Sequence, residues 1–155
     1  SSDVCSSVVV FVSMWFSTAK MAEAIAEGLL AGGAQPKLIP LNSNHRSNVA
    51  TVILEAGAAV VGSPTLNNNM YPTVADLLVY LKGLKPKYLV GAAFGSYGWS
   101  GEAVGQVRGM MEEMNNDLVD EGMRMKIVPD GDTLNKCIDL GLRVAEKVKP
   151  LSESA

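Results

Sequence analysis

Short apolar runs recur along the chain at intervals of about 25–30 residues, and a helical pattern follows most of them. The first run, residues 8–12, holds β-branched and aromatic residues without a polar break, which is typical of a strand buried on both faces of a parallel sheet. Comparable runs at residues 37–41, 58–62 and 88–94 predict three more strands. Residues 123–128 alternate between apolar and polar, which predicts a half-covered outer strand.

Apolar residues between these runs fall at helical spacing. They form one stripe within residues 21–30, and similar stripes lie at residues 72–81, 101–114 and 134–148. Alternation of this kind predicts a doubly wound, five-stranded parallel sheet with helices on both faces, an α/β fold. Pro40 lacks a backbone N–H, so its strand is expected near one edge of the sheet.

The length of 155 residues suits one domain. No linker or repeat divides the chain, so we expect a single domain over residues 1–155, with a core from about residue 8 to residue 149 and short flexible ends. The first apolar run is far shorter than the roughly 20 residues that span a bilayer, and no basic segment precedes it. We therefore expect a cytoplasmic protein without membrane attachment. A start at Ser1 rather than Met suggests a processed or excised piece.

Charge and residue counts exclude several classes of function. The net charge of −3 argues against binding of nucleic acid, which normally requires a basic surplus. Two cysteines, Cys5 and Cys137, are too few for a disulfide framework or a four-cysteine zinc site, and Cys137 falls on the core side of its helix. His45 is the single histidine, which disfavours His-based catalysis and most catalytic metal sites. We expect no catalytic or metal-ligating residue.

Ligands of an open parallel sheet bind at the carboxyl ends of its strands, so residues 13–18, 63–72 and 95–101 are the candidate segments. The first segment holds hydroxyl groups at the start of a helix, where backbone N–H groups and the helix dipole favour an anion such as phosphate. Ser17 or Thr18 could equally serve only as a helix cap. Spacing alone leaves both interpretations open.

The other two segments contain no charged residue. They combine the aromatic residues Tyr71, Tyr97 and Trp99 with amide and glycine backbone groups, which would suit a flat, neutral ligand. The alternative is that residues 67–69, three asparagines, form only a turn. A P-loop triplet and a GxGxxG fingerprint are both absent from the sequence.

Residues 13–22, 62–68 and 94–102 closely resemble the flavodoxin-like domain of the flavodiiron proteins, also called A-type flavoproteins. The resemblance extends from about residue 8 to residue 149. It implies a flavodoxin fold with strand order 2-1-3-4-5 and FMN as the cofactor. Phe16 and Asn69 depart from the family's pattern, in which a small or polar residue and a glycine are more common at these positions.

The resemblance also implies a role for each motif residue. Those around the FMN phosphate would be Ser13, Met14, Trp15, Phe16, Ser17 and Thr18. Those on one side of the isoalloxazine ring would be Pro64, Thr65, Leu66, Asn67 and Asn68. Those on the other side would be Ser96, Tyr97, Gly98, Trp99 and Gly101.

By this resemblance the chain is an FMN-binding electron-transfer domain of an oxidoreductase, which takes electrons from a rubredoxin-like or other small donor. In full-length flavodiiron proteins a di-iron domain precedes this one, accepts the electrons and reduces oxygen or nitric oxide. The chain has no room for that domain, so we expect an excised domain or a free-standing relative, and a homodimer is left open. The alternatives are a free-standing FMN-dependent reductase of quinones or similar small molecules, and a non-catalytic binding module that keeps the fold without the cofactor.

Overall fold

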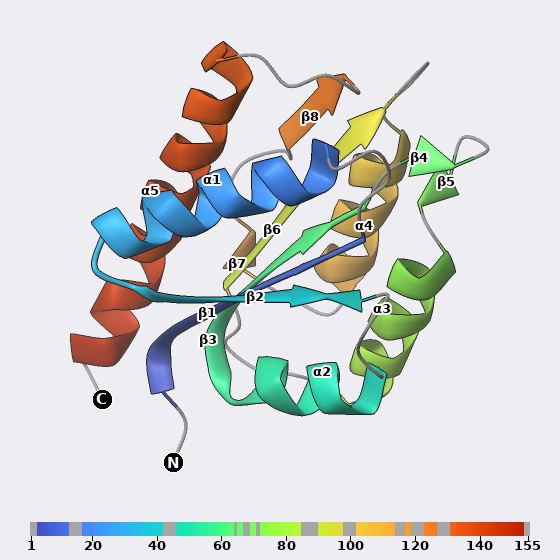
Figure 1. The fold of residues 1–155 in the computed structure, drawn as a ribbon. Coiled ribbons are helices and arrows are strands. Elements are labelled where there is room, and N and C mark those ends of the chain that lie inside the picture. The colour runs from blue at the N-terminus through green and yellow to red at the C-terminus, as the bar shows by residue number, and fades with distance from the viewer. Residues whose placement is uncertain are drawn as a thin grey trace.

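The structure is a computed structural model. It describes residues 3–12, 17–41, 46–63, 65–66, 69–70, 72–84, 90–97, 102–113, 117–118, 123–126 and 131–153. The strands are β1 (Asp3–Phe11), β2 (Gln35–Pro40), β3 (Ala56–Gly62), β4 (Thr65–Leu66), β5 (Asn69–Met70), β6 (Val90–Tyr97), β7 (Asp117–Leu118) and β8 (Met123–Lys126). The helices are α1 (Ser17–Ala31), α2 (Arg46–Leu54), α3 (Pro72–Leu84), α4 (Glu102–Glu113) and α5 (Gly131–Glu153) (Figure 1).

The main sheet has the strand order β2-β1-β3-β6, and all of these neighbours are parallel. On the far side of β6, β7 pairs with the start of the strand at Val90, and β8 pairs with its end from Phe94 to Tyr97. Two short strands therefore share the position predicted for a fifth strand. The predicted order 2-1-3-4-5 and the doubly wound fold are confirmed, with the outer strand in two pieces.

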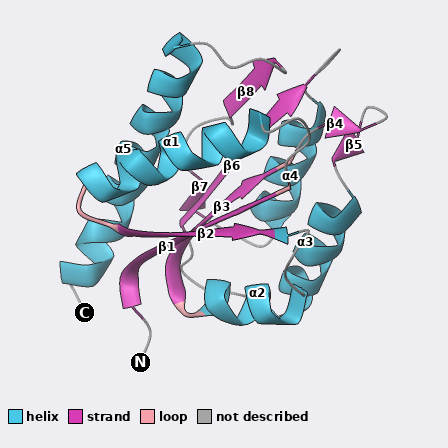
Figure 2. Ribbon diagram, in the orientation of Figure 1, coloured by secondary structure: helices cyan, strands magenta, loops and turns pink. Residues whose placement is uncertain are grey.

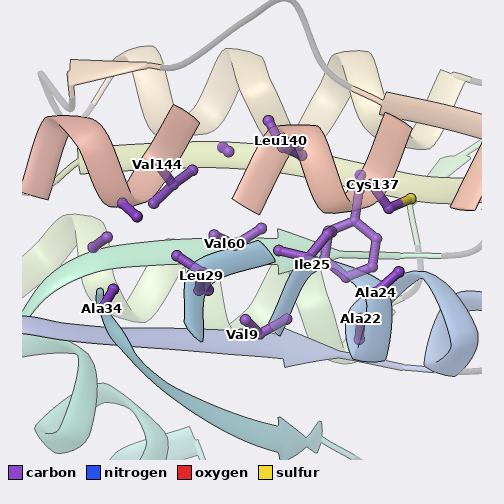
Figure 3. Close-up of a cluster of buried hydrophobic side chains, with 14 of the residues drawn as sticks. Val9, Ala22, Ala24, Ile25, Leu29, Ala34, Val60, Cys137, Leu140 and Val144 are labelled. Carbon is purple, nitrogen blue, oxygen red and sulfur yellow. The ribbon is translucent and has the colours of Figure 1, made fainter. Parts of the chain in front are cut away.

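The helices cover both faces of this sheet (Figure 2). Helices α1 and α5 lie on one face, where their side chains form a cluster with Val9 and Val60 (Figure 3). Helices α2, α3 and α4 cover the other face, where Val8 and Val10 belong to a second cluster. Because successive side chains of a strand point to opposite faces, burial of both faces explains why residues 8–12 carry no polar residue.

Strand β2 lies at an edge, as Pro40 predicted: within the described residues it pairs with β1 alone. The strand also contains Pro36, four residues before Pro40, so the two prolines occupy equivalent positions in the alternation of the strand. Residues of one parity in a parallel strand direct their backbone groups to the same side, and neither proline has an N–H to donate. The outer side of β2 is therefore poor in donors, which protects the edge from pairing with another strand.

The segment expected to be a loop after β3 contains a small antiparallel hairpin. Thr65 of β4 pairs with Met70 of β5, and Leu66 pairs with Asn69. This register leaves two residues, 67 and 68, to connect the strands, and both lie outside the described residues. Short strands of two residues produce too weak an alternation to be seen in the sequence.

Candidate functional site

The three central strands point to one end of the sheet, here called the carboxyl end, where β1 and β3 end level with each other and β6 continues to Tyr97. Phe11 of β1 pairs with Gly62 of β3, and Gly62 pairs with Phe94 of β6. Two further hydrogen bonds continue this alignment, from the Val12 N–H to the Gly62 carbonyl at 3.3 Å and from the Ser63 N–H to the Phe94 carbonyl at 3.1 Å. The three segments selected from the sequence therefore leave the same end of the sheet.

The first segment leads into α1. Ser17 begins this helix, and Thr18 is its second residue, with its side chain fully buried. A cap precedes the first helical residue, so the position of Thr18 inside the first turn disfavours the interpretation that Thr18 is only a cap. The first turn of α1 carries no acidic residue, so no carboxylate in that turn would repel a bound anion. Residues 13–16, also predicted to bind phosphate, lie outside the described residues.

The second segment forms the β4–β5 hairpin. Of the five residues predicted to line one side of a flavin ring, Thr65 and Leu66 form β4, next to the carboxyl end of β3. The hairpin contacts α4, which holds it on the side of the sheet that carries α2 and α3 (Figure 1). Pro64, Asn67 and Asn68 lie outside the described residues.

The third segment begins later than the sequence suggested. We predicted that β6 would end at Phe94 and that Ser96 and Tyr97 would belong to a loop, but both residues are in β6. They pair with Met125 and Lys126 of β8, and this pairing keeps the backbone extended. Gly98, Trp99 and Gly101 lie outside the described residues.

Ser63 is the first residue of the second candidate segment, and the sequence predicted no individual role for it. It is fully buried directly after β3, and its backbone N–H is bonded to β6. The available signal was its position as the first polar residue after an unbroken apolar run that ends in glycine.

Cys137 belongs to the apolar cluster between α5, α1 and the sheet (Figure 3). Its side chain is fully buried, and burial raises the pKa of the thiol from 9.0 to about 12. A neutral thiol among apolar side chains is inert, which confirms the expectation of a structural cysteine. His45 lies outside the described residues.

These features suit a ligand with one anionic end and one flat, neutral part. The N-terminus of α1 is the place where backbone N–H donors and the helix dipole favour the anionic end. Residues 63–72 and 95–101 contain no charged side chain, so they suit the flat, neutral part of such a ligand. The fold is that of a doubly wound α/β protein, a class that binds its ligands at the carboxyl end of the sheet.

Comparison with known proteins identifies the family. The family model described as flavodoxin matches residues 9–141, so the chain belongs to the flavodoxin family. A nitric oxide reductase from Moorella thermoacetica is 42% identical over 142 residues, which cover 91% of this chain and 36% of the relative.

Solved structures agree. The rubredoxin oxygen:oxidoreductase from Desulfovibrio gigas superposes with a TM-score of 0.94 at 35% identity, over 99% of this chain and 38% of that one. A flavodoxin from the domain Archaea superposes with a TM-score of 0.84 at 34% identity, over 93% of this chain and 99% of that one. The chain is therefore a flavodoxin-like FMN domain, homologous to the corresponding part of the flavodiiron proteins.

The chain spans only about a third of the length of the curated relatives it matches. Within the described residues, no helix combines the length and the apolar character that crossing a membrane requires.

Proposed function

We propose that this domain receives electrons from a small redox protein and delivers them to a metal centre. The donor would be rubredoxin-like and the acceptor a di-iron domain of a flavodiiron oxygen or nitric oxide reductase. Support for this proposal comes from the similarity to a nitric oxide reductase and a rubredoxin oxygen:oxidoreductase along nearly the whole chain. A homodimer and a cytoplasmic location stay predictions.

The cofactor FMN supplies the redox chemistry when bound, and the protein supplies binding, orientation and electrostatics. The observation that carries the proposed binding mode is the acid-free N-terminus of α1, with Thr18 buried in its first turn, beside the ends of β3 and β6. Backbone N–H groups of this turn and the hydroxyls of Ser13, Ser17 and Thr18 would hold the phosphate.

The ring would lie between two walls. Residues 64–68 would form one wall, and residues 96–101 would form the other. Tyr97 and Trp99 would cover or flank the ring, since aromatic side chains favour stacking on a flat partner. The absence of charge from both walls would keep the ring in a neutral environment.

A substitution at Thr18 tests the phosphate assignment. A lost hydrogen bond to a charged group costs about 1.5–3 kcal/mol, so Thr18→Ala should weaken FMN binding about ten-fold or more. Binding of riboflavin, which lacks the phosphate, should change little. Fluorescence titration of both ligands measures the difference.

Thr51→Ala is the matched control, because Thr51 is an exposed helical threonine of α2 whose Oγ1 donates to the Ser47 carbonyl at 2.9 Å. This variant should bind FMN as the parent does. Equal weakening of FMN and riboflavin by Thr18→Ala would remove the phosphate assignment. The alternative of a free-standing quinone reductase would require steady turnover with NAD(P)H and a quinone, and no comparison supports it.

A further inference from the structure

Two glycines at the carboxyl end of the sheet lie where neighbouring atoms leave no space for a side chain. The first is Gly62, which pairs with Phe11 on one side and with Phe94 on the other. A methyl group at Gly62 would come within 2.6 Å of Cε1 of the Phe94 ring, and closer still to its Cζ. Phe94 is fully buried, so its ring cannot swing into solvent to make room. The ring thus occupies the space that a side chain at position 62 would need.

The second glycine, Gly95, follows Phe94 directly. A methyl group at Gly95 would strike the backbone carbonyl oxygen of Ser63 and come within 3.1 Å of Val104 Cγ2 on α4. The Ser63 backbone has little freedom to retreat, because its N–H donates to the Phe94 carbonyl. Here the obstacle is backbone rather than the end of a flexible side chain.

Neither glycine is required by its backbone angles. Gly33, in the turn after α1, has a φ of 93°, whereas Gly62 and Gly95 have no φ in the left-handed region. Glycine is therefore needed at positions 62 and 95 only because the Phe94 ring and the Ser63 carbonyl lie too close to admit a side chain. The two glycines open toward opposite faces of the sheet, one beside Phe94 under α1 and the other beside Val104 of α4.

The two positions lie directly before the proposed walls of the ring site. Thr65 follows Ser63 by two residues, and Ser96 follows Gly95. We infer that Gly62 and Gly95 are positioning residues, which set the separation of the two walls and thereby their fit to a flavin ring. This inference rests on the proposed function. An added methyl group would move the end of β3 away from β6 and increase the distance between β4 and the last residues of β6, Ser96 and Tyr97.

Gly95→Ala is the primary test, with the affinities for FMN and riboflavin measured by fluorescence titration. Both ligands contain the ring, so both affinities should fall by the same factor of about ten or more, the equivalent of one lost hydrogen bond. This equal loss contrasts with Thr18→Ala, which should affect FMN alone. Unchanged affinity for both ligands would overturn the inference.

Gly28→Ala is the matched control. A methyl group at Gly28 of α1 would strike the Ile138 carbonyl of α5, a comparable backbone obstacle remote from the proposed walls. Gly28→Ala should lower the melting temperature while retaining the affinity for both flavins. If both variants weaken flavin binding equally at equal loss of stability, the role of Gly95 is only structural and the inference is wrong.

A second pair of variants keeps the test decisive if Gly95→Ala does not fold. Gly62→Ala should weaken both flavins, and Gly62→Ala combined with Phe94→Leu, which removes the ring atoms that the methyl meets, should recover most of the affinity. Absence of recovery would overturn the inference. Parent protein that binds neither flavin would instead overturn the proposed function.

Discussion

Close backbone approach occurs in two regions of this molecule, between α1 and α5 and at the carboxyl end of the sheet. At the helix contact, methyl groups on Gly28 and Gly141 would strike the carbonyl oxygens of Ile138 and Ile25. At the sheet, methyl groups on Gly62 and Gly95 would strike the Phe94 ring and the Ser63 carbonyl. Both regions therefore depend on glycines at positions where a side chain would clash with its neighbours.

The surroundings of these glycines differ. The contact between α1 and α5 is lined by buried apolar side chains such as Leu29, Leu140 and Val144 (Figure 3). The carboxyl end of the sheet instead contains the buried polar residues Thr18 and Ser63 and leads into uncharged segments. Burial of apolar surface stabilises a fold, whereas placed polar groups orient a ligand. We therefore expect substitutions in the two regions to separate stability from flavin binding.

The largest effect is expected in the helix contact. Leu140 is fully buried, and Leu140→Ala should leave a cavity that lowers the free energy of unfolding by about 2–5 kcal/mol. The affinity for FMN should remain that of the parent under conditions where the variant is folded. Urea denaturation and flavin titration measure the two quantities.

Leu30 of α1 provides the control, because 66% of its side chain is exposed. Leu30→Ala should change stability by less than about 0.5 kcal/mol. A loss of FMN affinity in Leu140→Ala, measured on fully folded protein, would show that the two regions are coupled.

Glycine substitutions sharpen the comparison within the helices. Gly28→Ala adds a methyl group against backbone and should cost up to about 3 kcal/mol of stability. Gly109 of α4 has no atom within 4 Å of the position a methyl group would take. Gly109→Ala should therefore stabilise the protein by about 0.5–1 kcal/mol through helix propensity. A similar loss in both variants, measured by urea denaturation, would contradict the steric explanation.

Charge at the carboxyl end should affect redox behaviour rather than stability. Two unit charges about 8 Å apart interact by about 2 kcal/mol at an effective dielectric constant of 20, or roughly 90 mV for one electron. Residues 63–72 and 95–101 contain no Asp or Glu, so we expect a second reduction potential less negative than in flavodoxins with acidic ring segments. Tyr97→Asp should lower that potential, because its carboxylate would repel the charge gained on reduction.

Thr51→Asp, an exposed position on α2, adds the same charge outside the proposed site and should leave the potential unchanged. Spectroelectrochemical titration at low salt and full FMN occupancy gives both values. Equal potentials in the parent and Tyr97→Asp would contradict the electrostatic argument.

Much of the fold followed from the sequence because both faces of the central strands are buried. Runs such as residues 8–12 are then continuously apolar, and their alternation with helical stripes indicates a parallel sheet. The outer strand was harder to predict from the sequence. Its position is shared by β7 and β8, and β7 has only two residues. Pairing of this kind depends on the neighbouring strand and leaves no periodic pattern.

The candidate site was predictable in position and less so in detail. The rule that ligands bind at the carboxyl ends of strands selected the three segments, and the strand pairing confirms that β1, β3 and β6 point to the same end of the sheet. Sequence reasoning missed the continuation of β6 to Tyr97, which depends on pairing with β8. It also missed the contacts of Gly62 and Gly95, because a clash between strands distant in sequence has no local signature.

The buried thiol of the helix contact allows a stability effect to be measured by changing the pH alone. Cys137 is surrounded by an apolar cluster, and burial raises its pKa from 9.0 to about 12. The unfolded thiol ionises near its ordinary pKa while the folded thiol stays neutral, so this contribution to stability is complete below about pH 9 and is lost as pH rises toward 12. The loss approaches about 1.4 kcal/mol per pH unit in that window. In Cys137→Ala the other ionisable groups are the same, so the difference in unfolding free energy between parent and variant should shrink by about 1.5 kcal/mol from about pH 9 to about pH 10.5. Urea denaturation at several pH values checks this expectation, and a difference that stays constant with pH would mean that the thiol is not shielded from water as the α1–α5 contact requires.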